Sequence, residues 1–305
     1  MGVGSPQEMI EETKGDLGKD VLRDVSRSFY LTLRALPSGM REATSVGYLL
    51  ARASDTIADC GGERAARLEL LEDFRKVVNG KAVEGFFAAA SAIAGESGLK
   101  EGERVLMRRL EEVFVWWQML RNEEREAVRA VVTTITTGQV WDLERFPEGE
   151  VVSLSEAAEA EEYCYRVAGC VGEFWTEVGF GSDEEFANKP KEEMRKLGKN
   201  YGKGLQLVNI LRDETEDEQR GRQYLPGPRE EWLAKARGFL EDGLSYSRAV
   251  RGRRARMATV LPALIGRETL SLLERASQEE LASGVKVGRK VVKRCLWQAF
   301  FFKKG

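Results

Sequence analysis

Two pairs of aspartates, each spaced four residues apart, are the side chains of this sequence best suited to chemistry. Asp55 and Asp59 lie in YLLARASDTIAD, and Asp213 and Asp217 lie in LQLVNILRDETED. On a helix this spacing places both carboxylates on one face, with Cβ atoms about 5–6 Å apart. Both segments are rich in apolar residues, so the carboxylates are costly to bury and repel each other. A shared divalent cation removes both costs, and hard oxygen ligands suit Mg²⁺.

Polar side chains accompany both pairs. Arg52 and Tyr48 stand one and two turns before Asp55, and Gln206 and Asn209 extend the stripe of the second pair. Such a set can bridge Mg²⁺ to a diphosphate, whose departure ionises an allylic carbon. A water-excluding apolar cavity would protect the resulting cation. For either pair alone, a solvated helix face is the alternative interpretation.

Composition excludes several other chemistries. The 305 residues contain no histidine, which rules out a Ser-His-Asp device and a histidine-ligated zinc site. The four cysteines form no C-x-x-C pair, so a four-thiolate zinc site is also not expected. Proton transfer must use carboxylates, tyrosines, lysines, water or the substrate. Lys plus Arg is 47 and Asp plus Glu is 50, and this net charge of −3 gives no argument for nucleic acid.

Helices must position these residues, because apolar side chains recur at helical period along most of the chain. We predict one all-α domain with a central ligand cavity, and no strand of alternating pattern with hairpin turns. The expected helical stretches are 41–59, 64–79, 103–141, 154–180, 191–219, 230–250, 253–276 and 278–300. The expected division is an N-terminal extension over 1–20, the helical domain over 21–283 and a tail over 284–305.

Four blocks of sequence, in order and at matching spacing, resemble the squalene/phytoene synthase family. They are Ser26 to Tyr30 (SRSFY), Tyr48 to Asp59, Tyr163 to Gly172 (YCYRVAGCVG), and Gln206 to Pro226, which ends in G-R-Q-Y-L-P. The resemblance covers about residues 20–275. It implies the all-α isoprenoid synthase fold, that is, a single helical domain around a central cavity.

The resemblance also implies roles for individual residues. The metal ligands would be Asp55, Asp59, Asn209, Asp213 and Asp217, with Mg²⁺ as the ion and Mn²⁺ as an alternative. The substrate-binding residues would be Ser26, Arg27, Ser28, Phe29, Arg52, Gln206, Asn209 and Arg212. The catalytic residues would be Tyr48, Arg52 and Tyr163, with Tyr163 a candidate for steering proton loss. For both tyrosines, a core position with a satisfied hydroxyl is the alternative.

Further positions fit the family less specifically. Gly138, Gln139 and Asp142 resemble a cavity-lining G-x-x-x-D step of some members. Gly169 and Gly172 would let helices or a prenyl chain approach closely. Tyr165 is a departure, because eukaryotic-type members have histidine there.

Within the family, the motifs are most similar to those of squalene synthases. These enzymes join two farnesyl diphosphates into presqualene diphosphate and reduce it with NADPH to squalene. No dinucleotide-binding glycine pattern follows a strand, so NADPH would need another site, for which Arg222 is the best candidate. Without reduction the product would be dehydrosqualene, hydroxysqualene or presqualene diphosphate, and a phytoene synthase is a further alternative. A terpene cyclase and a non-enzymatic helical scaffold are the other hypotheses.

The C-terminal stretch 284–305 combines seven basic residues with clustered aromatics and no acid. This composition is typical of an interfacial membrane anchor, and the alternative is a last core helix whose aromatics pack inward. No uncharged run reaches the roughly 20 residues of a transmembrane helix. We therefore expect a cytoplasmic protein, plausibly monomeric, at the inner face of the membrane.

Overall fold

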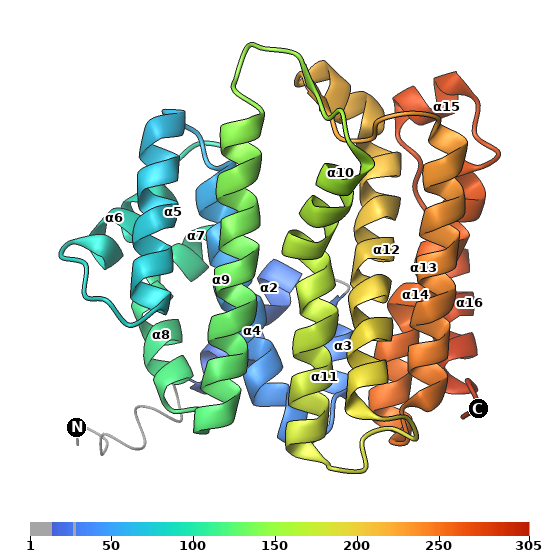
Figure 1. Cartoon of the computed structure of the whole chain (residues 1–305). Coiled ribbons are helices and arrows are strands. Elements are labelled where there is room, and N and C mark those ends of the chain that lie inside the picture. Colours follow the sequence, from blue (N-terminus) through green and yellow to red (C-terminus); the bar gives the residue numbers. More distant parts are fainter. Residues whose placement is uncertain (1–13, 27–28, 305) are drawn as a thin grey trace. The chain divides into compact units, whose positions relative to one another are not determined.

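The computed structural model describes residues 14–26 and 29–304, and its elements are almost all helices (Figure 1). This confirms the all-α fold class. The chain separates into two compact units. The first holds the described residues up to Arg34 together with Ser38–Val140, and the second holds Ala35–Pro37 and the described residues from Trp141 onward.

The first unit is built around a long helix, α4 (Ser38–Asp59), which contacts α2, α5, α7 and α8 of the same unit. Its buried apolar residues recur every three or four positions, as at Val46, Leu50, Ala53 and Ile57, and so form one packing face. The elements of this unit are η1 (Leu17–Val21), α2 (Leu22–Ser26), α3 (Phe29–Ala35), α4, α5 (Arg64–Val78), α6 (Phe86–Ala92), η2 (Ile93–Gly95), α7 (Glu101–Arg108), α8 (Leu110–Gln118) and α9 (Asn122–Arg145). The last residue of α3, Ala35, and residues 141–145 of α9 belong to the second unit.

An aromatic cluster fills the core of the first unit. Phe74 meets Phe86 and Phe114 edge to face, with ring centroids 6.0 and 5.8 Å apart, and Phe114 meets Trp117 in the same way. The single helix expected over 103–141 is wrong, since α7, α8 and α9 replace it. Arg109 leaves the helical conformation between α7 and α8 without any glycine or proline to signal the break.

The second unit is organised by α12 (Lys191–Gln219), whose bounds match the predicted stretch. This helix packs against α11, α13 and α14, its neighbours in Figure 1. The elements of the unit are β1 (Val152–Ser153), α10 (Ala157–Cys164), η3 (Tyr165–Gly169), α11 (Cys170–Ser182), α12, β2 (Arg222–Gln223), α13 (Arg229–Ala249), α14 (Arg253–Leu273), α15 (Gln278–Ser283) and α16 (Arg289–Phe300).

Glycines allow α11 and α12 to approach at backbone distance. A Cβ atom at Gly172 would lie 1.8 Å from the carbonyl oxygen of Gly198, and one at Gly202 would lie 2.1 Å from that of Ala168. No side chain fits in that space. The prediction that Gly172 lets helices approach closely is confirmed, as is that for Gly169, which faces the carbonyl oxygen of Lys199.

The segment predicted as one helix over 154–180 contains a π-helical turn, η3, between α10 and α11. The only strands among the described residues are β1 and β2, which form a two-residue parallel pair without a hairpin turn. Val152 N donates to the Gly221 carbonyl at 2.8 Å. Gly221 has a φ of 78°, a conformation that favours glycine. This pair fixes the chain on either side of Arg222.

Candidate active site

The first aspartate pair lies on α4 with its predicted neighbours. Arg52 donates to Glu103 at 2.8 Å and lies 3.8 Å from Asp55, so one guanidinium faces two carboxylates. Tyr48 is largely buried and donates to the Val25 carbonyl at 3.3 Å. Burial raises the pKa of Tyr48, against the opposing effect of Arg52. The structure therefore brings Tyr48, Arg52 and Asp55 into one connected polar stripe.

Asp55 carries the most perturbed carboxyl of the first unit. Burial and the nearby Asp59 raise its pKa to about 7, although Arg52 and a hydrogen bond from Gln139 act in the opposite direction. Gln139 Nε2 donates this bond to Asp55 Oδ1 at 2.5 Å. The protein's own groups therefore do not fully stabilise the negative charge of ionised Asp55, and a bound cation would supply the missing stabilisation.

Beside Asp55 lies an oxygen atom of the kind that a hard cation such as Mg²⁺ accepts as a ligand. Gln139 is 8 % exposed, and its Oε1 atom is buried without a hydrogen-bond partner in the described part of the chain. Carboxylate and amide oxygens are ligands that hard cations accept. Among the described residues, no group of three or more cysteine, aspartate or glutamate side chains is placed to hold a metal ion.

The second aspartate pair lies at the C-terminal end of α12, in the second unit. Arg212 Nε and Nη2 donate to the two oxygens of Asp213 at 2.8 and 2.6 Å, a bidentate pair. Burial and Asp213 raise the pKa of Asp217 to about 6, with Arg222 and Arg220 opposing. Asn209 is exposed on the same stripe, one turn before Asp213. Two acids and an amide are again presented on one helix face.

Arg222 and Tyr163 meet around a buried acid. Arg222 Nη1 donates to Asp142 Oδ2 at 3.0 Å, and the Tyr224 hydroxyl donates to Asp142 Oδ1 at 2.6 Å. The Tyr163 ring stacks on Tyr224 at 5.0 Å and lies 5.6 Å from the Trp141 ring. Burial raises the pKa of Tyr163 well above its ordinary value, with contributions from Asp142 and a hydrogen bond to Tyr224.

The positions of the remaining predicted residues say less about their chemical roles. Ser26 is buried at the end of α2, and its hydroxyl donates to the Leu22 carbonyl in the preceding turn. Arg27 and Ser28 lie outside the described residues, and Phe29 is the first residue of α3. Gln206 lies on α12 one turn before Asn209.

Sequence reasoning missed the partners that other elements supply. Glu103 of α7 holds Arg52, and Tyr224 joins Tyr163 to Asp142. The G-x-x-x-D step at Gly138 was the one signal that pointed toward Gln139 and Asp142. No spacing rule could have identified Glu103, because it lies on a separate helix from Arg52.

All four cysteines are free and buried. The C-terminal aromatics divide into two groups. Trp297 and Phe301 are 67 % and 63 % exposed and stack at 5.7 Å, and Phe300 is also exposed. Phe302 alone packs against the core of the second unit. The inward-packing alternative for this segment therefore holds only for Phe302. No described helix is long and apolar enough to span a membrane.

Comparisons with known proteins all indicate the same family. The model of the squalene/phytoene synthase family matches residues 22–234. A squalene synthase of Schizosaccharomyces pombe is 29 % identical over 220 residues, which is 70 % of this chain but 44 % of that protein. A presqualene diphosphate synthase of Zymomonas mobilis is 32 % identical over 220 residues, covering 72 % of this chain and 62 % of that protein.

Solved structures agree on the fold. A complex of TcSQS with the ligand E5700 superposes with a TM-score of 0.76 at 21 % identity, covering 95 % of this chain and 86 % of that one. A dehydrosqualene synthase with bound ligand gives a TM-score of 0.64 at 20 % identity, over 97 % and 98 % of the two chains. At this identity the likeness concerns the fold alone.

Proposed function

Because this chain belongs to the squalene/phytoene synthase family, we propose that it is a Mg²⁺-dependent prenyltransferase acting on two farnesyl diphosphates. The observation that carries the proposal is the Asp55 carboxylate, with its raised pKa, beside the unpartnered amide oxygen of Gln139. A second perturbed acid lies on α12, where desolvation and the nearby Asp213 raise the pKa of Asp217 to about 6. A helical scaffold has no use for two such costly arrangements.

In this proposal Asp55, Asp59, Asn209, Asp213 and Asp217 hold Mg²⁺, which would neutralise the leaving diphosphate. Positive side chains of the protein bind the same diphosphates. Arg52 and Arg212 are each held by a neighbouring carboxylate, so their guanidinium groups are pre-oriented and need little reorganisation when the charge develops. Ser26, Arg27, Ser28, Phe29 and Gln206 complete the proposed substrate contacts.

Tyr163 is proposed to guide proton loss after the two chains have joined. Its raised pKa means that Tyr163 rests as the neutral phenol. If its oxygen takes up a proton, its own hydroxyl proton must therefore pass to a neighbouring group. The hydrogen bond to Tyr224, and from Tyr224 to Asp142, offers that route. Tyr48 is the second proposed cavity tyrosine, fixed by its hydrogen bond to the Val25 carbonyl.

We propose squalene as the final product, formed by NADPH reduction of presqualene diphosphate. Arg222 is the candidate for the phosphates of NADPH, because Asp142 and the β1–β2 pair hold it in place. The relatives diverge at this step, since one is named a squalene synthase and another a presqualene diphosphate synthase. Release of presqualene diphosphate, or of an unreduced product, is the alternative.

A ligand-stabilisation experiment tests the metal-dependent substrate site. Farnesyl thiodiphosphate should raise the melting temperature, and Mg²⁺ or Mn²⁺ should produce a further increase over the value in EDTA. Asp213→Asn should abolish this increase, whereas Asp183→Asn, an exposed aspartate outside the proposed site, should retain it. Equal stabilisation in EDTA, or in Asp213→Asn, would overturn the metal-dependent proposal and favour a scaffold.

We also propose that the segment around α16 binds the surface of a membrane. Trp297 and Phe301 form a stacked aromatic pair that is exposed. Basic side chains flank this pair in the sequence, with Lys293 before it and Lys303 and Lys304 after it. Aromatic and basic side chains together suit an anionic interface. Trp297→Ser with Phe301→Ser should reduce co-sedimentation with phosphatidylglycerol vesicles, while Leu272→Ser, another exposed apolar residue, should not. Undiminished binding by the double variant would refute this assignment.

A further inference from the structure

An open pocket of about 570 Å³ lies in the first unit, away from Asp55. Its lining comes from η1 and the residues before it, α3, the first two turns of α4, and Trp116 of α8. Of its α4 residues, Ser45 is nearest to Asp55 in the sequence and precedes it by ten positions, about 15 Å along the helix at 1.5 Å per residue. The pocket is therefore too far from Asp55 to share a metal-bound diphosphate.

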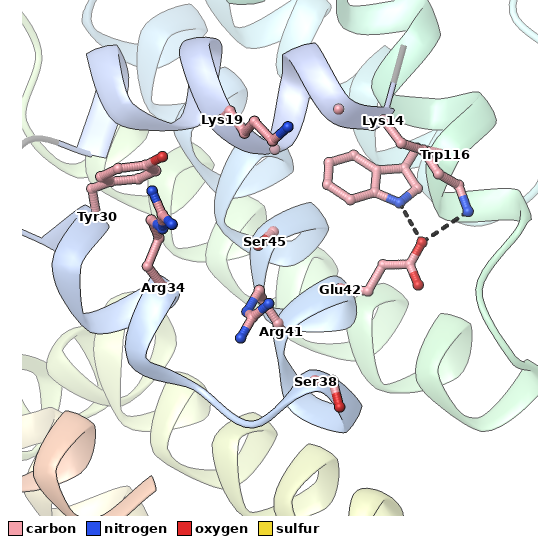
Figure 2. Close-up of a pocket in the computed structure, with 11 residues that line it drawn as sticks. Lys14, Lys19, Tyr30, Arg34, Ser38, Arg41, Glu42, Ser45 and Trp116 are labelled. Atoms are coloured by element: carbon pink, nitrogen blue, oxygen red, sulfur yellow. Dashed lines mark hydrogen bonds and ion pairs between the residues drawn. The ribbon is translucent and has the colours of Figure 1, made fainter. Parts of the chain in front are cut away.

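The pocket gathers positive charge on a chain whose net charge is −3. Among the described residues that line it, the cations are Lys14, Lys19, Arg34 and Arg41, and the only acid is Glu42. Figure 2 shows Lys19, Arg34 and Arg41 around the position of Ser45.

One oxygen of Glu42 already has two partners within the protein. Trp116 Nε1 donates to Glu42 Oε1 at 2.7 Å, and Lys14 Nζ lies 2.9 Å from the same oxygen, as Figure 2 shows. Burial favours the neutral form of Glu42, but these two partners outweigh it and lower its pKa. Glu42 therefore pairs with Lys14 and orients Trp116.

Lys19 and Arg34 have no acidic partner among residues 14–26 and 29–304. The nearby acids Asp20 and Asp24 are paired with Arg23, at 3.2 and 3.0 Å. The Arg34 guanidinium instead lies 5.9 Å from the centroid of the Tyr30 ring, which orients it beside the pocket. Two cations therefore border the pocket without a counter-charge from the described part of the chain.

The backbone of the N-terminal helix keeps the pocket open. Gly15 and Gly18 line it, and a Cβ atom at Gly18 would lie 3.2 Å from the Trp116 ring. Gly18 and Lys19 belong to the π-helical turn η1, a local distortion that recurs at functional sites. A larger residue at Gly18 would press on the tryptophan that forms one wall.

From this arrangement we infer that the pocket binds a phosphate-bearing anion, held by Lys19 and Arg34 with Arg41 and the Ser45 hydroxyl. Phosphate oxygens are strong acceptors for ammonium and guanidinium donors. A free diphosphate and the headgroup of an anionic lipid present the same chemistry. This site differs from the proposed active site in that it needs no metal ion.

Calorimetric titration of the full chain with inorganic diphosphate in EDTA tests the inference, because EDTA silences any metal-dependent site. Lys19→Gln with Arg34→Gln should weaken binding about tenfold or more, since both removed groups are charged donors. Lys81→Gln with Arg254→Gln is the matched control, which removes two exposed cations elsewhere and should leave binding unchanged.

A second arm identifies the source of the phosphate. Phosphatidylglycerol vesicles are sedimented with chains that carry Trp297→Ser and Phe301→Ser, so that the C-terminal segment does not contribute. Loss of vesicle binding on Lys19→Gln with Arg34→Gln identifies a lipid headgroup, and loss of diphosphate binding alone identifies a free anion. The inference is overturned if neither probe binds, or if the control variant weakens binding as much as the pocket variant does.

Discussion

Gln139 of α9 donates a 2.5 Å hydrogen bond to Oδ1 of Asp55 on α4 and keeps its own Oε1 atom buried without a partner in the described chain. The Gln139 amide thus holds the Asp55 carboxylate in place and adds its own oxygen beside it. Leaving a buried acceptor unsatisfied costs about 1–3 kcal/mol. A cation shared by both oxygens would recover that cost.

Replacing Gln139 tests this role. Gln139→Leu should weaken the apparent affinity for Mg²⁺ about 10–100-fold, because it removes both an oxygen and the group that orients Asp55. The measurement is prenyltransfer rate against Mg²⁺ concentration. Gln118→Leu, the same change at an exposed position, should leave the curve in place. A Gln139→Leu curve that coincides with wild type would exclude Gln139 from the metal site.

The aspartates themselves should be essential. We expect Asp55→Asn and Asp213→Asn each to lower kcat by about 100-fold or more, because the leaving diphosphate loses its neutralising charge. Circular dichroism should show both variants folded. Asp73→Asn serves as the control, since Asp73 is an ion-pair partner of Lys76 on α5. Near-normal turnover in either site variant would argue against the proposed ligands.

Asp55 should also limit the stability of the metal-free protein. Its folded pKa of about 7 lies above the ordinary 3.8, so the folded state binds the proton more tightly. The free energy of unfolding must then fall as pH rises from about 4 to 7. Because 45 % of the side chain is exposed, solvent screening reduces the penalty to about 1 kcal/mol.

Asp55→Asn removes that penalty. In EDTA at pH 8 the variant should melt about 2 °C above wild type, and the difference should vanish below about pH 4. Thermal denaturation across pH measures both. A variant that is less stable than wild type at pH 8 would mean that ionised Asp55 is already compensated within the protein.

Tyr224→Phe should distinguish a role of Tyr224 in proton transfer from a role in packing. The ring can still stack on Tyr163 at 5.0 Å, but the 2.6 Å hydrogen bond to Asp142 is lost. We expect kcat to fall about 100-fold with little change in KM. Tyr246→Phe is the control, because it deletes another buried hydroxyl, bonded to Thr176, away from Tyr163. If both variants lowered kcat equally, the Tyr224 hydroxyl would have only a structural role.

Gly172→Ala should destabilise the second unit. The added methyl would lie 1.8 Å from the Gly198 carbonyl oxygen, so α11 and α12 must separate. Overpacking of this kind typically costs 1–3 kcal/mol. Gly181→Ala on the same helix meets no atom within 4 Å and should cost nothing. Denaturant titration of both variants would reveal whether the glycine contact is required.

The sequence predicted what depends on local periodicity. The bounds of α12 and the aspartate spacing follow from residues close together in the chain. The break at Arg109 carries no glycine or proline, and the pairing of Glu103 with Arg52 joins separate helices. Such features depend on tertiary packing, which no single segment encodes.

Product analysis tests the central claim most directly. Purified protein is incubated with farnesyl diphosphate and Mg²⁺, with and without NADPH, and the extract is analysed by mass spectrometry. We predict a product containing both farnesyl chains that requires Mg²⁺, and squalene only when NADPH is present. A joined but unreduced product in both incubations would remove the reductive step alone. The absence of any joined product with Mg²⁺ would contradict the proposed head-to-head prenyltransferase.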